Sequence, residues 1–500
     1  MAHNLAQRGV SSIKWNIIAS GAHLLLAFLQ TTLLARLLPI ETFGIYSAVM
    51  AVIGVAAIFA VFGMGGAFLH RAPETQDIDR AASLHFTLTL IITTVWAGVM
   101  LAGVMLLVDA EQHDLRTAFL VVIGTKTVVH LTHTPRVYLS RQVKHRRLAV
   151  IDIILYFLTA VVSVGLALTG ATLWALLAGN ILEAVVSVIG LYIWRPVWRP
   201  RLTWSVPGFR YFLTFGSRQF AATLLLNLLD KVDDIWTGSY LGTLALGYYS
   251  RAYQFAKLPS YTLASPINNV AAGIYAELVG DSETLSRAFA RINVLMIRSG
   301  FFLAGAMALI APELIHILIG ERWLPMIDAF RLMLIFALFD PMKQTIGSLF
   351  TAVGKPGLLA RVRFIQFIAM ILGLFALGPL LGIAGVALAV NLMLAVGIAL
   401  LLRYARVYVQ FSLKQFFAVP LLAVGLGLAA GSLALVWLEM PLPVWVSAGL
   451  KFTVFTISYA LVLLVWDRQN VRDALQLVHK YVLVRPQRKR SPEPESKTGA

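Results

Sequence analysis

The architecture of this chain follows from the stretch Leu38–Ser47, LPIETFGIYS, because the stretch Leu241–Ser250, LGTLALGYYS, repeats its pattern 203 residues later. Leucine, glycine, tyrosine and serine occupy the same places in both stretches. A second set of matches, 211 residues apart, pairs Lys144 with Lys355, Ala149 with Ala360, and Asn180 with Asn391. A length difference of eight residues between two halves reconciles the two offsets. Self-similarity at a fixed spacing indicates an internal duplication.

The composition places both copies in a membrane. The 500 residues are 59% hydrophobic and 13% charged, with a mean hydropathy of +0.80. A soluble domain is usually about 45–50% apolar and about 25% charged. These values exclude a soluble enzyme and a disordered chain. The absence of cysteine excludes disulfides, thiol catalysis and thiolate metal sites.

Fourteen apolar segments are close to the ~17–25 residues that a membrane-spanning helix needs. The first apolar run has no cleavage site before the next span, so we expect it to be retained as a helix. The fold class is therefore an all-α membrane protein with about 14 transmembrane helices. The expected spans are 14–37, 43–69, 83–108, 116–138, 148–169, 172–194, 211–237, 248–275, 292–319, 327–353, 360–380, 383–402, 415–438 and 444–466.

The basic residues predict the orientation of these spans. If both termini are cytoplasmic, 29 of the 41 lysines and arginines lie in cytoplasmic segments and 3 lie in external loops. Such an asymmetry is the positive-inside pattern of membrane proteins. It explains the net charge of +17 without nucleic acid as a partner. Residues 471–482 have the spacing of a short interfacial helix on an anionic leaflet, and Arg485–Arg490 is a basic cluster; alternatively, this tail is only a positive-inside anchor.

Six spans separate the two copies, and an even number gives both the same orientation. This is a parallel repeat, related by an axis along the membrane normal. We expect two pseudo-symmetric six-helix lobes, residues 1–200 and 201–408, followed by two additional helices in 409–466 and a cytoplasmic basic tail in 467–500. Two facing lobes enclose a cavity that can open to either side, which is the geometry of alternating access.

Charged side chains inside spans are costly and mark functional sites by default. Nine basic residues and seven acidic residues lie in the spans, a slight excess that favours an anionic substrate. Arginine binds phosphate oxygens in pairs and stays ionised. Arg218 and Arg298 either extend to the cytoplasmic interface or face the cavity. The cavity candidates are Arg218, Arg251, Arg298, Lys126, Lys257 and Arg36, of which Arg36 is placed near the outer interface.

Other ionisable residues form candidate coupling or polar networks. Lys126, His130 and His133 have helical spacing and share one face, as a cavity wall, a proton relay or a network within one lobe. Asp230, Asp233 and Asp234 surround Lys231; they either hold a coupling ion or, as we favour, form an ion-pair cluster near the outer interface, with Asp230 and Asp234 on one face. Asp340 and Lys343 have the spacing of a self-neutralising pair, and Glu183 has no partner in the pattern.

Several motifs are missing. Gly354–Gly357 is a turn and not a phosphate-binding loop, because no Gly-Lys-Ser/Thr follows a strand. The chain contains no metal-binding His-Glu-x-x-His motif and no nucleophile elbow. It also lacks the long loops in which a membrane polymerase would build its site. We therefore expect a transporter and not an enzyme, with no cofactor and no metal.

One part of the sequence resembles a known family. The stretch Asp233–Gly242, followed by Ala245–Tyr253, is similar to a signature of bacterial polysaccharide-export flippases. Phe43–Tyr46 and Phe62–Gly65 are similar to it as well. The similarity is greatest to the colanic-acid-exporter-like branch of the multidrug/oligosaccharidyl-lipid/polysaccharide superfamily, and it covers most of the first twelve spans. Ser239 departs from the pattern, since relatives often carry a basic residue there.

The resemblance implies a function. It implies a flippase of the bacterial cytoplasmic membrane that moves a polyprenyl-pyrophosphate-linked oligosaccharide to the outer leaflet for exopolysaccharide or lipopolysaccharide synthesis. It implies a central cationic cavity and coupling to an ion gradient or to the membrane potential. The implied partners are the lipid-linked oligosaccharide, membrane lipids, and a polysaccharide polymerase with its chain-length machinery. The alternative is a cation-coupled multidrug or small-molecule efflux transporter of the same superfamily.

Overall fold

The structure is a computed structural model that describes residues 2–70, 77–142, 144–259, 265–436, 442–470 and 472. Its described segments contain helices and no strand, as the composition predicts. The expected interfacial helix and basic cluster of the tail lie outside the described residues. The first half contains α1 (Ala2–Leu37), α2 (Ile40–Val61), α3 (Met64–His70), α4 (Ile78–Leu107), α5 (His113–Leu131), α6 (His133–Arg141), α7 (His145–Leu168), α8 (Thr172–Val188) and the π-helical turn η1 (Ile189–Ile193).

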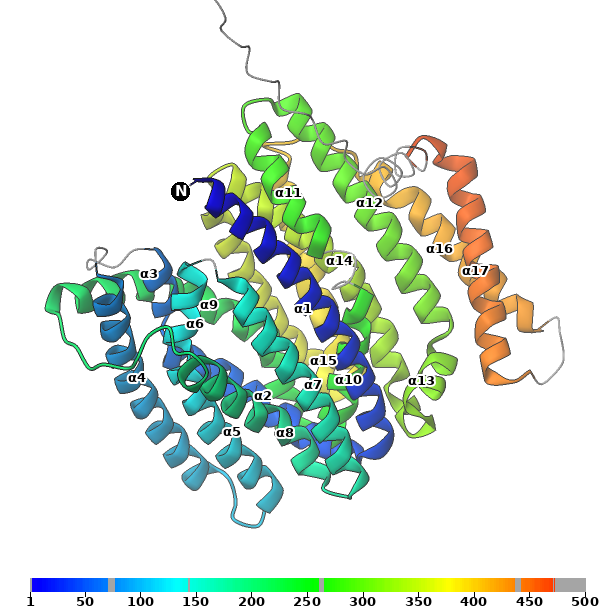
Figure 1. Cartoon of the computed structure of the whole chain (residues 1–500). Coiled ribbons are helices and arrows are strands. Elements are labelled where there is room, and N and C mark those ends of the chain that lie inside the picture. Colours follow the sequence, from blue (N-terminus) through cyan, green and yellow to red (C-terminus); the bar gives the residue numbers. More distant parts are fainter. Residues whose placement is uncertain are drawn as a thin grey trace, which may run out of the picture.

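The second half is longer. It contains α9 (Val206–Tyr240), α10 (Thr243–Pro259), α11 (Ser265–Leu278), α12 (Ser282–Leu309), α13 (Ala311–Ile319), the 3-10 turn η3 (Glu321–Met326), α14 (Ile327–Ala352), α15 (Pro356–Ala405), α16 (Leu413–Val436) and α17 (Val444–Trp466). Figure 1 shows α2 to α8 grouped on one side, α10 to α15 on the other, and α16 and α17 at the far edge. The last two helices pack on each other and on α12.

Nine helices of the described part are long and apolar enough to cross a membrane. This confirms a helical membrane protein, whereas the number of fourteen spans stays a prediction. One of the nine, α15, has 50 residues and contains the two expected spans 360–380 and 383–402. Its backbone leaves the helical region at Gly382, where φ is +58°, a value that glycine adopts without strain. The helix therefore changes direction at that residue.

Four expected spans are interrupted. The span 43–69 breaks at Phe62, which adopts a left-handed conformation beside Gly63. The span 116–138 breaks at Thr132, and the span 248–275 divides into α10 and α11. The expected span 292–319 instead combines α12 and α13, and α12 begins at Ser282. Hydropathy averaged over the length of a span locates apolar stretches but does not detect these interruptions within them.

Helices α2 and α10 meet at reciprocal glycines. A Cβ on Gly44 would lie 1.7 Å from the backbone oxygen of Thr243, and a Cβ on Gly247 would lie 2.5 Å from that of Ile40. Gly247 follows Gly44 by 203 residues, and Thr243 follows Ile40 by the same number. Two copies related by a twofold axis make such reciprocal contacts, because each contact between a residue of one copy and a residue of the other occurs a second time with the copies exchanged. The glycines allow the two backbones to touch.

Two corresponding helices begin in the same way. The Asp77 carboxylate accepts hydrogen bonds from the backbone N–H groups of Asp79 and Arg80 at the start of α4. The Asp281 carboxylate accepts from the Thr284 N–H and hydroxyl at the start of α12. Aspartate at this position satisfies the free N–H groups of a first helical turn. These two helices are the third span of each expected copy.

Candidate functional site

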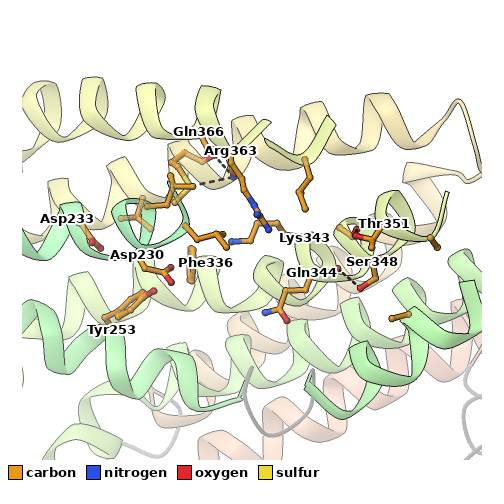
Figure 2. A pocket seen from close by; sticks show the side chains of 18 of the residues that line it. Asp230, Asp233, Tyr253, Phe336, Lys343, Gln344, Ser348, Thr351, Arg363 and Gln366 are labelled. Atoms are coloured by element: carbon orange, nitrogen blue, oxygen red, sulfur yellow. Dashed lines mark hydrogen bonds between the residues drawn. The ribbon is translucent and has the colours of Figure 1, made fainter. Parts of the chain in front are cut away.

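A cavity of about 600 Å³ lies among five helices of the second half. Its volume is within the ~300–1,000 Å³ typical of small-molecule sites. Helices α9, α10, α11, α14 and α15 supply its walls (Figure 2). The polar and aromatic side chains that line it are Asp230, Asp233, Tyr253, Phe336, Lys343, Gln344, Ser348, Thr351, Arg363 and Gln366.

The α9 wall carries two carboxylates one turn apart. Asp230 is exposed to the cavity, and it has no hydrogen bond or ion pair with any other residue that the structure describes. Asp233 is 4% exposed, and its Oδ2 accepts a hydrogen bond of 2.6 Å from the Tyr249 hydroxyl. Its Oδ1 is buried and has no partner among the described residues. This wall therefore presents the Asp230 carboxylate to the cavity without a hydrogen bond or ion pair from the described residues, whereas Oδ1 of Asp233 is unpartnered but buried.

The α14 wall carries a cation and amides. The Lys343 amine lies 2.7 Å from Oδ1 of Asp340, so the pair predicted from the i, i+3 spacing is confirmed. Gln344 donates to Oδ2 of Asp340 at 2.8 Å and accepts from the Asn268 amide at 3.1 Å. Gln344, Ser348 and Thr351 lie on one face of α14 because their spacing follows the helical period.

The α15 wall supplies a second cation. Arg363 extends from α15 toward Lys343 in Figure 2, and its acidic electrostatic neighbour is Asp230. Gln366 lies one turn farther along α15 and donates to the Met393 carbonyl oxygen at 3.3 Å. Helix α15 begins at Pro356, where proline is favoured because the first turn needs no N–H donor. Arg363 is therefore inside the helix.

Two aromatic rings complete the cavity. The ring centroids of Tyr253 on α10 and Phe336 on α14 are 5.8 Å apart. The Lys257 amine lies 4.4 Å from the Tyr253 ring centroid and 5.5 Å from that of Phe336. Such distances are typical of cation–π contacts. Lys257, a predicted cavity cation, thus contacts two lining rings but is not itself among the lining residues.

The predicted network of α5 lies in the first half. Lys126 forms a salt bridge of 2.7 Å with Glu183 of α8, so Glu183 has a partner that the sequence pattern did not show. His130 is buried and its ring packs on Trp96 with centroids 5.2 Å apart. His133 follows the break at Thr132 and lines a different cavity of about 510 Å³ between α2, α3, α6 and α9.

The acidic cluster of α9 is divided between two cavities. Asp230 and Asp233 line the cavity described above, whereas Asp234 lines another of about 930 Å³ together with Glu41 and Asp114. Asp230 and Asp234 are four residues apart on the continuous helix α9 and so share a face, as expected, although they line different cavities. Lys231 lies 3.3 Å from Asp234, so part of the cluster is an ion pair.

Four predicted arginines lie outside the lining of the 600 Å³ cavity. Arg36 donates to the carbonyl oxygens of Ile317 and Leu318 at the end of α13, with a distance of 2.8 Å to Leu318. Arg251 is buried, and its guanidinium carbon lies 4.4 Å from the Phe43 ring centroid. Arg298 is buried in an ion pair with Asp467. Arg218 is exposed on α9.

Sequence reasoning missed six lining residues with polar groups, namely Tyr253, Gln344, Ser348, Thr351, Arg363 and Gln366. Arg363 was not selected, because it lies only three residues inside the expected span 360–380 and was counted with the cytoplasmic charges beside it. The proline at Pro356 was the signal that would have placed Arg363 two turns inside α15. Gln344, Gln366 and Tyr253 carry no charge, so no rule about intramembrane charges could select them. No group of histidine, aspartate and glutamate in the described part could hold a metal ion.

Residues 33–328 match a protein family described as "Polysaccharide biosynthesis protein". The lipopolysaccharide biosynthesis protein WzxC of Escherichia coli (strain K12) is 24% identical over 77% of this chain and 78% of its own length. The teichuronic acid biosynthesis protein TuaB of Bacillus subtilis (strain 168) is 22% identical over 71% and 73%. The succinoglycan biosynthesis transport protein ExoT of Rhizobium meliloti (strain 1021) is 25% identical over 62% and 63%.

Solved structures share the fold. The lipid II flippase MurJ in an inward closed conformation superposes with a TM-score of 0.74 and 14% identity, covering 92% of this chain and 100% of its own. An inward-facing multidrug resistance transporter of the MATE family superposes with a TM-score of 0.55 and 14% identity, covering 77% and 94%. The helical transporter fold expected from the sequence is therefore confirmed.

Proposed function

Because the chain belongs to the polysaccharide biosynthesis protein family that matches residues 33–328, we propose that it is a flippase for a lipid-linked oligosaccharide. One observation carries this proposal. The 600 Å³ cavity with charged and hydrogen-bonding walls lies among helices of a membrane protein, where such groups are costly unless they serve a ligand. The chain is a transporter and not an enzyme, and its substrate carries a polyprenyl pyrophosphate.

The contacts between α1 and η3 support alternating access. Arg36 donates to the last carbonyl groups of α13, and the Arg322 guanidinium and the Trp323 indole N–H donate to the carbonyl oxygen of Ala35, the latter at 2.9 Å. The end of α1 thus donates to carbonyl groups at the end of α13, and η3 donates to a carbonyl group at the end of α1. Carbonyl groups in the last turn of a helix have no partner within that helix. These contacts, here called the outer clasp, join the first half of the chain to the second and must break if the two halves separate on that side.

The orientation and partners belong to the same proposal. The protein lies in the bacterial inner membrane with both termini cytoplasmic, supported by the distribution of basic residues. The outer clasp then faces the periplasm. The two lobes comprise residues 1–200 and 201–408, supported by the reciprocal glycine contacts. A polysaccharide polymerase and its chain-length machinery use the product on the outer side.

The test is transport in vesicles by the purified protein. The probe is a polyprenyl-pyrophosphate-linked oligosaccharide extracted from the source strain after deletion of this gene, with a labelled sugar. We expect active protein to move the label to the opposite leaflet, and heat-inactivated protein to leave it in place. Ethidium efflux is the matched measurement for the alternative of a drug transporter. Ethidium movement without movement of the labelled lipid would refute the flippase and support that alternative.

A further inference from the structure

The charges of the 600 Å³ cavity are balanced. Asp230 and Asp233 contribute two negative charges, and Lys343 and Arg363 contribute two positive charges. Lys343 is in addition neutralised by Asp340, outside the lining, at 2.7 Å. A pyrophosphate carries several negative charges and requires an excess of fixed cations in a low-dielectric interior. The cavity has no such excess, so its walls do not fit the pyrophosphate of the substrate.

The cavity does offer an unsatisfied acceptor. Oδ1 of Asp233 is buried without a partner in the described structure, and its carboxylate is held in place by the Tyr249 hydroxyl. That oxygen is shielded from the cavity, whereas the Asp230 carboxylate is exposed to it without a hydrogen bond or ion pair in the described structure, so Asp230 is the acceptor that a donating ligand can reach. Hydroxyl groups donate without adding charge.

The other walls suit a sugar as well. Arg363 and Gln344 have planar groups with several N–H donors, which can bind neighbouring oxygens in pairs. Ser348 and Thr351 add hydroxyl oxygens that can accept, since each hydroxyl donates to a backbone carbonyl oxygen of α14. Tyr253 and Phe336 present ring surface, on which the apolar C–H face of a sugar ring can be buried.

We propose that this cavity binds the hydroxyl groups of the substrate's sugar, and that the pyrophosphate remains outside it. The proposal rests on the flippase function stated above. The sugar unit that binds in the cavity carries no net charge. Asp230 and Arg363 select it through hydrogen bonds.

Arg218 marks where the pyrophosphate lies. It precedes Leu226 and Leu229 of the cavity wall by eight and eleven residues, so it lies near the same face of α9. It is twelve residues from Asp230, about 18 Å along the helix. Arg218 is therefore displaced from the cavity wall toward the start of α9. A sugar held at Asp230 would leave the attached pyrophosphate on the side of this exposed guanidinium.

The test compares two lipids bound to the purified full-length protein in nanodiscs. One is the lipid-linked oligosaccharide from the gene-deleted strain, and the other is undecaprenyl pyrophosphate without sugar. The variants are Asp230→Asn and Arg363→Gln. Arg361→Gln is the matched control, since Arg361 is exposed on the same helix and does not line the cavity.

We expect each of the two cavity variants to weaken binding of the sugar-bearing lipid at least about tenfold, as lost hydrogen bonds to charged groups do. Binding of the sugar-free lipid should change less than about twofold. Arg218→Gln should weaken both lipids, and Arg361→Gln neither. Asp230→Asn is the variant that disturbs folding least, because Asp230 has no hydrogen bond or ion pair in the described structure to lose.

Two results would overturn the proposal. Equal loss of both lipids in the cavity variants would place the pyrophosphate in the cavity. No change for either lipid would show that the cavity does not bind the substrate. If the unmutated protein binds neither lipid, the flippase function itself has failed, which is a different outcome from both.

Discussion

The hydroxyl oxygens of Ser47 and Ser250 are 3.0 Å apart, and these serines occupy the same place in the two halves of the repeat. A residue that meets its own repeat equivalent lies on or beside the axis that relates the copies. The hydrogen bond joins α2 to α10, next to the reciprocal glycines Gly44 and Gly247. The two copies of the repeat recognised in the sequence therefore contact each other at this interface between the halves.

Gly44→Ala should disrupt this interface. The added methyl group would lie 1.7 Å from the Thr243 carbonyl oxygen, which belongs to the backbone and cannot turn away. We expect a fall of several degrees in the Tm of the purified protein, because overpacking costs about 1–3 kcal/mol or more. Gly98→Ala is the control, since a Cβ at Gly98 meets nothing within 4 Å. Equal Tm values for the two variants would show that α2 and α10 can separate freely.

Lys126→Met and Glu183→Gln should each destabilise the first half of the chain. Each leaves the remaining partner of the 2.7 Å salt bridge unpaired, at a cost of about 2 kcal/mol. The double variant should cost less than the two single variants together, since neither charge remains. The free energies of unfolding of the two single variants and the double variant, measured in detergent, give the interaction free energy of the pair. Additive costs would mean that the pair contributes no interaction free energy.

Arg298→Ala should reduce the amount of folded protein and not act on transport alone. Arg298 is 8% exposed and pairs with Asp467, and its backbone oxygen accepts a hydrogen bond of 2.8 Å from Tyr459. Removing one partner of a buried pair costs about 3–5 kcal/mol. The double variant Arg298→Met with Asp467→Leu should recover much of the stability and of the transport. A stable Arg298→Ala protein that binds no substrate would instead return this arginine to the substrate site.

Arg36→Ala should open the outer clasp more often. The variant loses the hydrogen bonds to Ile317 and Leu318. In this chain without cysteine, a single Cys at Ser250 would then react faster with an impermeant thiol reagent added outside. Arg116→Ala is the control, because its side chain bonds to the Met105 sulfur and not to the other half. Unchanged labelling in Arg36→Ala would mean that the clasp does not restrict opening.

Labelling also tests the orientation. A Cys in place of Lys144 should react with impermeant reagents only from the cytoplasmic side, and one in place of Glu111 only from outside. The prediction follows from the excess of basic residues around Lys144. Reaction of the Lys144 replacement from outside would invert the topology.

The sequence was informative where the signal was local or repeated. The helical membrane fold followed from apolar length, and the Asp340–Lys343 pair followed from its spacing. Contacts between distant residues could not be predicted, since no local pattern links Lys126 to Glu183 or Arg298 to Asp467. The cavity was found only in part. Its carboxylates and Lys343 were selected by charge, whereas Arg363 depended on where a helix begins.

The most direct test of the proposed mechanism is a cross-link between Ser47→Cys and Ser250→Cys. The native hydroxyl oxygens are 3.0 Å apart, so the two thiols should form a disulfide under oxidation. Transport of the labelled lipid-linked oligosaccharide is measured in vesicles before oxidation, after oxidation and after reduction. If α2 and α10 must separate at these two residues to release the lipid, transport should stop when the cross-link forms and return when it is reduced. Transport at the full rate by the cross-linked protein would contradict alternating access between these halves.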